Sequence, residues 1–294
     1  MKKKKNTAFH IVNAIFLGLI CSTCVLPFIN LLAVSFSGST AVAAGKVGFW
    51  PVDFTLSSYK YVLTSGKFFR AMGISILRVL LETGLNLTLM VLVAYPLSRD
   101  KPGQLLGRKI YVYFFMITML VGGGMIPTYL VVSGLGLKNT MWALILPGAL
   151  PVSNMIILMN FIRELPDEIE EAAALDGATP FQTLTKIILP LLKPSLATVG
   201  LFCMVNHWND WFSGMIYMSE DMYPLQTYLQ SVIKDFDTLL LTNKSADIAS
   251  LLAQMNARTG RAAQLFLGAL PIMLVYPFLQ KYFTKGLVLG SVKG

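Results

Sequence analysis

Residues 11–36 read IVNAIFLGLICSTCVLPFINLLAVSF and contain no charged side chain. About 20 consecutive apolar residues are enough for a helix to cross a bilayer, and in lipid each backbone amide needs a partner within the protein. This run therefore predicts a membrane-spanning α-helix. Of the 294 residues, 55% are hydrophobic and 13% are charged, whereas a soluble domain carries about 25% charged residues. The sequence predicts an all-α polytopic membrane protein.

Five further apolar runs are long enough to cross a bilayer. With the first run they predict six transmembrane helices in a single membrane domain over residues 1–294, at approximately residues 11–35, 71–97, 110–132, 141–162, 196–218 and 263–283. Gly122, Gly123, Gly124 and Pro127 fall in the third run. Glycine and proline weaken a helix interior, so we expect this span to be broken or bent.

The N-terminus resembles a signal peptide because Lys2–Lys5 precede the first apolar run. The apolar core of a signal peptide has about 7–15 residues, however. Residues 11–36 exceed that length, so we expect an uncleaved first span.

The distribution of basic residues predicts that both termini are cytoplasmic. Short cytoplasmic loops are rich in Lys and Arg, and the loop at 98–109 contains Arg99, Lys101, Arg108 and Lys109. Residues 38–70 and 219–262 are then outside, where the second segment either contacts a soluble partner or serves as a connector. The net charge of +9 comes from bases at the ends of apolar runs, which argues against nucleic acid as a partner.

The sequence offers little for catalysis or cofactor binding. It contains no glycine-rich phosphate loop, so we expect no nucleotide or other cofactor on this chain. Cys21, Cys24 and Cys203 lie within apolar runs, which predicts unbridged thiols and no metal site. A membrane enzyme remains an alternative, but His10 and His207 are the two histidines, and we predict no catalytic residue.

Residues 166–190, between the fourth and fifth runs, read PDEIEEAAALDGATPFQTLTKIILP. The acidic residues at the start complement the positive end of a helix dipole. Gly177 can close this helix in the left-handed conformation. Thr179 and Gln182 have the spacing of a capping box for a second helix, and Pro190 is expected to limit it. The segment predicts a helix, a sharp turn and a second helix at the cytoplasmic face.

The spacing within this segment resembles the EAA motif of ABC importer permeases. Glu171-Ala172-Ala173 is followed after three residues by Gly177, then after nine residues by Ile187, and then by Leu189-Pro190. The Trp208-Asn209 pair and the C-terminal GSVKG resemble the carbohydrate-uptake branch, the relatives of the maltose permease. The long loop before the last span is similar to that of oligosaccharide and polysaccharide-fragment permeases of Gram-positive bacteria.

This resemblance implies the permease subunit of an ATP-driven importer in the bacterial cytoplasmic membrane, carrying a sugar or oligosaccharide. Import of a non-sugar solute is the alternative. The implied partners are a second permease chain forming a heterodimer, two ATPase subunits that bind ATP and Mg, and an extracytoplasmic solute-binding lipoprotein. By match to the motif, the residues coupled to the ATPase are Glu171, Ala172, Ala173, Gly177 and Pro190.

Polar residues within spans are costly in lipid and usually face a bundle interior. The fifth run contains HWNDW at 207–211. Tryptophan faces stack on sugar rings, whereas Asn and Asp bind hydroxyls, so the candidate substrate path consists of Trp208, Asn209, Asp210 and Trp211. A structural contact between helices is the alternative. Arg78 and Glu82 share a helical face, which predicts an internal ion pair.

Overall fold

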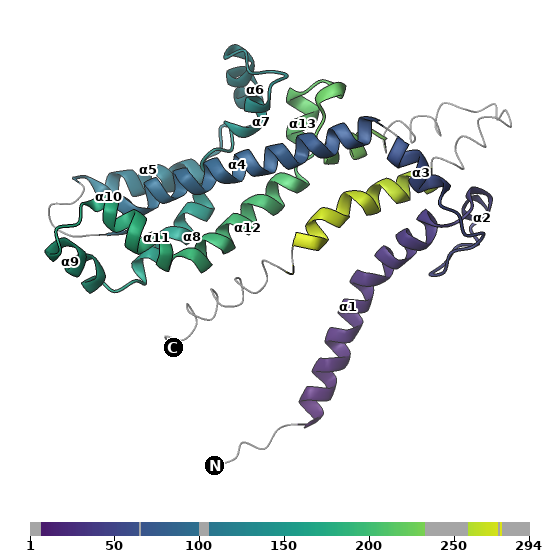
Figure 1. Cartoon of the computed structure of the whole chain (residues 1–294), viewed down its shortest axis with the longest axis horizontal. Helices are drawn as coiled ribbons and strands as arrows, with labels where there is room; N and C mark the ends of the chain where they lie inside the picture. Colours follow the sequence, from purple (N-terminus) through teal and green to yellow (C-terminus); the bar gives the residue numbers. More distant parts are fainter. Residues whose placement is uncertain (1–6, 65, 100–105, 233–257, 276, 278–294) are drawn as a thin grey trace. The chain divides into compact units, whose positions relative to one another are not determined.

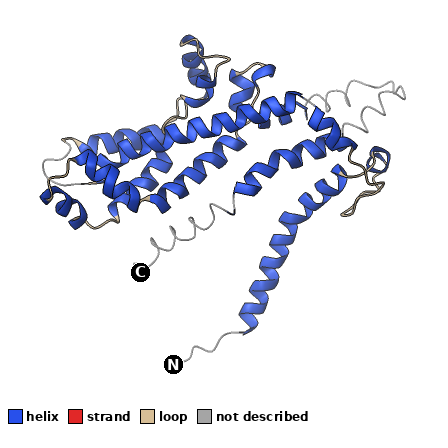
Figure 2. Ribbon diagram, in the orientation of Figure 1, coloured by secondary structure: helices blue, strands red, loops and turns tan. Residues whose placement is uncertain are grey.

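The computed structural model describes residues 7–64, 66–99, 106–232, 258–275 and 277. Every regular element within these residues is helical, as Figures 1 and 2 show. The prediction of an all-α protein is therefore confirmed. The chain divides into two compact units, one formed by residues 1–69 with 229–270 and the other by residues 70–228 with 271–294.

The first unit begins with α1 (Thr7–Ser35), which has a mean hydropathy of 2.2 over its most apolar part, and that part is not buried within the chain. Such a helix suits a lipid environment. The unit continues with α2 (Ser39–Ala43) and α3 (Ser57–Thr64). Phe36 follows α1 and stacks on Tyr59 with ring centroids 4.7 Å apart, which folds the intervening loop back toward the end of α1. Residues 258–270 of this unit are also helical.

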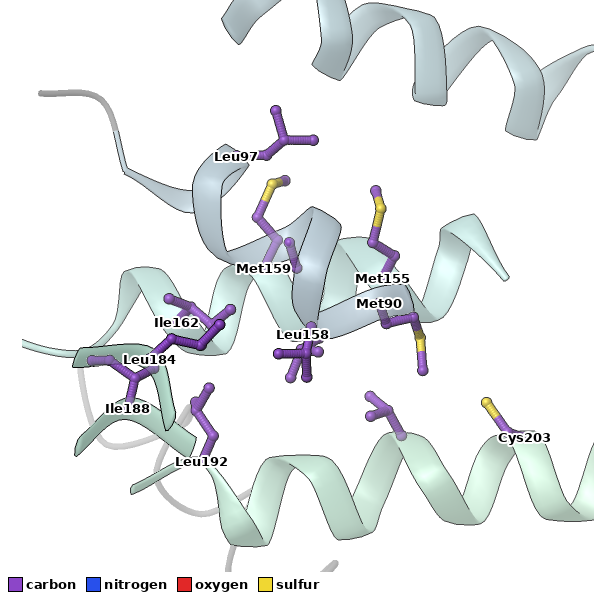
Figure 3. Packing of buried hydrophobic residues seen from close by; sticks show 13 residues of the cluster. Met90, Leu97, Met155, Leu158, Met159, Ile162, Leu184, Ile188, Leu192 and Cys203 are labelled. Carbon is purple, nitrogen blue, oxygen red and sulfur yellow. The ribbon is translucent and has the colours of Figure 1, made fainter. Parts of the chain in front are cut away.

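The core of the second unit is built on the long helix α4 (Gly66–Ser98), from Arg70 onward. Met90 of α4, Leu158 of α8 (Val152–Arg163) and Val199 of α12 (Lys193–Asn209) are fully buried in one apolar cluster, which Figure 3 shows from close by. These residues fill the space between three helices, and the second unit is therefore a helical bundle.

Several predicted spans are interrupted at glycine, proline or polar residues. α5 (Arg108–Leu120) and α6 (Met125–Gly134) are bent by 108°, with Gly124 at a φ of +83° between them. The predicted break in the third span is confirmed. The fourth run forms α7 (Met141–Ile145) and α8, with two prolines between them, and the fifth forms α12 and α13 (Phe212–Tyr217) with a break at Asp210.

Among the described residues, α1 and α4 are the two helices that are long and apolar enough to cross a membrane singly, and the number rises to four if each bent pair is one span. Six crossings therefore stay a prediction. The sixth predicted span is helical over 263–275, and most of its remainder lies outside the described residues. Most of the predicted outer segment at 219–262 also lies outside them, at 233–257.

The segment at 166–190 forms the predicted helix, turn and helix. It consists of α9 (Glu168–Leu175), α10 (Pro180–Gln182), the π-helix η1 (Thr183–Ile188) and α11 (Leu189–Leu191). Pro190 was expected to limit the second helix, but the helix continues to Leu191. Proline has no N–H and clashes with the carbonyl four residues earlier in α-geometry. The wider π turn directly before Pro190 accommodates both effects.

Candidate functional site

The first candidate site is the hairpin at 166–190, which lies at the end of the second unit where α4 ends (Figure 1). Helix α9 has two distinct faces. Ala173 is 4% exposed and packs toward its own bundle, whereas Leu175 is 90% exposed. Glu171 and Ala172 are also exposed. Of the motif residues on α9, Ala173 therefore supports the helix from behind, and the other two face outward.

Gly177 makes the turn between the two arms of the hairpin. Its φ is +78°, a conformation that favours glycine. Its N–H donates to the Ala174 carbonyl at 3.0 Å, and the N–H of Ala178 donates to the Ala173 carbonyl at 2.9 Å. These two bonds form a Schellman motif, which satisfies the last carbonyls of α9. The predicted role of Gly177 in closing the first helix is confirmed.

The second arm begins with the predicted capping box. The Thr179 N–H donates to Oε1 of Gln182 at 2.9 Å, and the Gln182 N–H donates to Oγ1 of Thr179 at 3.3 Å. These reciprocal bonds satisfy two backbone donors that a helix start leaves free. The arm then continues to Leu191 and is bent by 79° from α12, so one short break separates the hairpin from the next long helix.

Arg99, directly after α4, links this helix to the hairpin. Its Nη1 lies 2.7 Å from Oδ1 of Asp167 and donates to the Leu165 carbonyl at 3.1 Å. Its Nε lies 3.0 Å from Oε1 of Glu170. Sequence reasoning had counted Arg99 as one of several cytoplasmic bases and missed this role. The signal available was an arginine at a helix end together with the acid-rich start of the segment at 166–190.

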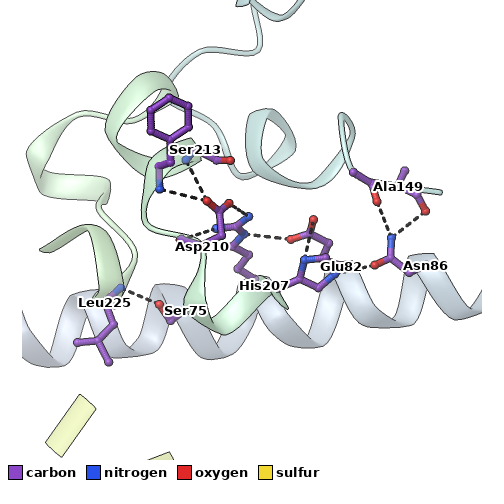
Figure 4. Close-up of polar contacts among 11 residues, drawn as sticks. Ser75, Glu82, Asn86, Ala149, His207, Asp210, Ser213 and Leu225 are labelled. Atoms are coloured by element: carbon purple, nitrogen blue, oxygen red, sulfur yellow. Dashed lines mark hydrogen bonds and ion pairs between the residues drawn. The ribbon is translucent and has the colours of Figure 1, made fainter. Parts of the chain in front are cut away.

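The second candidate site is a polar cleft of about 730 Å³ in the second unit. It is lined from α4, α6, α7, α12, α13 and the breaks between them, and its polar lining includes Arg78, Glu82, Asn206, Asn209, Asp210 and Trp211. Figure 4 shows the polar contacts along its wall. Its volume is within the range of small-molecule sites, and polar groups converge on it as they do in such sites.

Arg78 is the centre of an ion-pair network in this cleft. Its Nε lies 3.0 Å from Oε2 of Glu82, and its Nη2 lies 2.7 Å from Oδ2 of Asp210. Its Nη1 donates to the Asp210 carbonyl at 3.4 Å. The Arg78 and Glu82 side chains are 3% and 2% exposed. The predicted internal ion pair is confirmed, and Asp210 extends it to the break between α12 and α13.

His207 and Asn86 continue the network to the break between α7 and α8. His207 Nδ1 lies 3.2 Å from Oε1 of Glu82, and its Nε2 lies 2.6 Å from Oδ1 of Asn86. Nδ2 of Asn86 donates to the carbonyls of Gly148 and Ala149 at 2.9 and 2.8 Å. These carbonyls belong to non-helical backbone, which membrane proteins tolerate where it is buried in protein or lines a cavity.

Asp210 also organises the break between α12 and α13. While Oδ2 faces Arg78, Oδ1 accepts hydrogen bonds from the N–H groups of Phe212 and Ser213, both at 3.1 Å. The carboxylate therefore caps the start of α13. The Asp210 side chain thus fixes α12 and α13 relative to α4, and it has an architectural role in this structure.

The structure brings together three of the four predicted path residues. Asn209, Asp210 and Trp211 line the cleft, whereas Trp208 is 7% exposed and is not part of the lining. A helix turns by about 100° per residue, so Asn206, Asn209 and Asp210 share a face that Trp208 does not. Sequence reasoning missed Asn206, which this helical spacing could have identified. No group of three or more metal-ligating side chains occurs in the described part of the chain.

Comparison with known proteins gives the class to which this architecture belongs. Residues 76–288 match the family described as binding-protein-dependent transport system inner membrane component, and the chain belongs to that family. Protein LplC of Bacillus subtilis (strain 168) is 39% identical over 99% of this chain and 97% of its own length. The polygalacturonan/rhamnogalacturonan transport system permease protein YtcP of the same organism is 36% identical over 99% of this chain and 100% of its own length.

A solved structure agrees with this assignment. A bacterial ABC transporter involved in the import of the acidic polysaccharide alginate contains a chain that matches with a TM-score of 0.84 and 32% identity, covering 96% of this chain and 99% of that one. The present chain is therefore a membrane permease subunit of an ABC importer, in the group that carries sugars and oligosaccharides. Such permeases are not enzymes. The alternative of a non-sugar solute receives no support from these relatives.

Proposed function

We propose that the chain crosses the membrane six times with both termini in the cytoplasm, the hairpin at 166–190 on the cytoplasmic side and the polar cleft toward the outside. The positions of Arg78 and Arg99 on or directly after the same helix support this arrangement. At 1.5 Å per residue they are separated by about 30 Å, the thickness of a bilayer core. The basic loop at 98–109 favours the cytoplasm for the Arg99 end.

The proposed role of the hairpin is to dock α9 into an ATPase subunit. Glu171 and Ala172 are exposed on α9 and form the contact, while buried Ala173 and the Gly177 turn set the position and angle of the helix. Pro190, with the π turn before it, sets the geometry of the second arm. ATP and Mg are bound by the ATPase subunits. A second permease chain completes the path as a heterodimer, and an extracytoplasmic lipoprotein delivers the solute.

The proposed role of the cleft is to form part of the substrate path. Asn206 and Asn209 have amide groups suited to sugar hydroxyls, and Trp211, which is 38% exposed, has an aromatic face suited to stacking on a sugar ring. Arg78 is already engaged by Glu82 and Asp210. The cleft wall of this chain is therefore built for hydroxyl groups, and recognition of substrate carboxylates falls to the partner permease or the binding protein.

The substrate that we propose is an oligosaccharide containing uronic acid. YtcP is a polygalacturonan/rhamnogalacturonan transport system permease, and the alginate transporter is involved in the import of an acidic polysaccharide. The observation that carries this proposal is the match to the alginate transporter over nearly the whole chain.

Uptake in cells tests this substrate. Cells with and without the chain are supplied with oligogalacturonate, oligoalginate or neutral maltotriose. Uptake of at least one acidic oligosaccharide that depends on the chain is expected. Dependence for maltotriose alone would overturn the acidic substrate but leave the permease role intact.

A further inference from the structure

Arg99 is a buried cation that connects two parts of the proposed coupling apparatus. Its side chain is 7% exposed and that of Glu170 is 9% exposed. A buried charge is costly unless it is paired and hydrogen-bonded. Arg99 and Glu170 compensate each other's charge, although they lie 71 residues apart in the sequence. The pair therefore holds α9 in a defined position against the end of α4.

The geometry of Arg99 fixes more than one point on the hairpin. Its guanidinium reaches the Leu165 carbonyl and Asp167 before α9, and Glu170 within the first turn of α9. A planar guanidinium with several donors can hold such a set of acceptors, whereas a lysine ammonium on a flexible stem cannot reproduce this geometry. These three contacts around the start of α9 restrict both its rotation and its distance from the end of α4.

Arg99 directly follows α4, and this helix extends without interruption from Arg99 to the cleft. Arg78, Glu82 and Asn86 lie on α4 and contact Asp210, His207 and the break after α7. A displacement of α9 that is transmitted to α4 through Arg99 therefore reaches the residues that line the cleft.

We propose that Arg99 is a positioning residue that fixes the coupling helix α9 to the cytoplasmic end of α4, so that α4 connects the ATPase contact with the substrate path. This inference rests on the proposed function, because it requires that α9 contacts the ATPase.

The test uses the whole importer, purified with its ATPase and partner permease and reconstituted with its binding protein. The variants are Arg99→Lys and Glu170→Gln, with Glu164→Gln as the matched control because Glu164 is an exposed acid at the end of α8. Two quantities are measured on equal amounts of assembled complex: oligogalacturonate or oligoalginate transported per ATP hydrolysed, and photo-crosslinking to the ATPase from a photoreactive residue at the exposed position of Leu175.

We expect Arg99→Lys and Glu170→Gln to lower transport per ATP by about tenfold, within the range usual for coupling between two sites. The control should match the wild type, and crosslinking to the ATPase should persist in all variants. A residue needed only for stability would lower the amount of complex and leave this ratio unchanged.

The two possible failures are distinguishable. Unchanged transport per ATP in both variants, with crosslinking to the ATPase intact, would overturn the role of Arg99 and leave the docking role of α9 standing. Absence of any crosslink to the ATPase in the wild-type complex would overturn the docking role and, with it, this inference.

Discussion

Among single residues, Asp210 makes two structural contacts with one carboxylate. One oxygen pairs with Arg78, and the other caps α13. Its removal therefore loses a largely buried ion pair and a helix cap together. Asn is a good N-cap residue but has no charge. Comparison of Asp210→Ala with Asp210→Asn therefore separates the contribution of the cap from that of the ion pair.

We predict that Asp210→Ala destabilises the protein by about 3 kcal/mol or more, since it breaks a mostly buried pair and removes the cap. Asp210→Asn keeps the cap and should be less destabilising by about 1 kcal/mol. Unfolding of the purified protein by denaturant, followed by circular dichroism, measures the difference. Equal losses for the two variants would show that the cap contributes nothing.

Gly214 is a second residue whose substitution tests the structure. Close packing around it, rather than its backbone conformation, requires a glycine there. A Cβ there would overlap Oγ1 of Thr227 and would lie 2.9 Å from Cδ of Pro224. The Thr227 hydroxyl also donates to the Trp211 carbonyl at 2.8 Å. The segment after η2 (Glu220–Met222) therefore crosses α13 at a point where only glycine fits.

We predict that Gly214→Ala destabilises the protein by about 1–3 kcal/mol through overpacking. Gly73→Ala on α4 is the matched control, because nothing lies within 4 Å of its Cβ position and alanine favours a helix. The midpoint of thermal unfolding in detergent measures both. A Gly214→Ala protein as stable as the Gly73→Ala protein would contradict the close crossing.

At the scale of elements, the hairpin shows which features are predictable from local sequence. The Thr179–Gln182 capping box and the Gly177 turn depend on side chains within a few residues of one another, and both were predicted. The break at Gly124 was predicted for the same reason. The continuation of the second arm past Pro190 was not, because the π turn that accommodates this proline leaves no simple spacing signal.

The hairpin also gives a prediction for transport. Gly177→Pro should abolish ATP-dependent uptake because proline cannot adopt a φ of +78°. Gly177→Asn should retain most uptake, since Asn tolerates the left-handed conformation. Uptake of radiolabelled oligosaccharide in cells, at matched membrane levels of the permease, measures the difference. Full uptake with Gly177→Pro would contradict the proposed role of this turn in coupling.

At the scale of the whole molecule, the sequence predicted the helical class but not the contacts between distant elements. Periodicity placed Arg78 and Glu82 on one face, yet it could not show that Asp210, 132 residues later, completes the network. It likewise could not pair Arg99 with Glu170, 71 residues away. Both contacts depend on how α4, α12 and the hairpin pack, and that packing is set by many apolar residues together.

This chain is one permease subunit of a multi-subunit oligosaccharide importer. That assembly can be tested by gentle purification of the tagged chain from its native membrane, followed by mass spectrometry of the proteins that accompany it. We expect a second permease chain, an ATPase and a solute-binding lipoprotein. Recovery of the chain alone, under conditions that keep a control transporter intact, would rule out such an assembly.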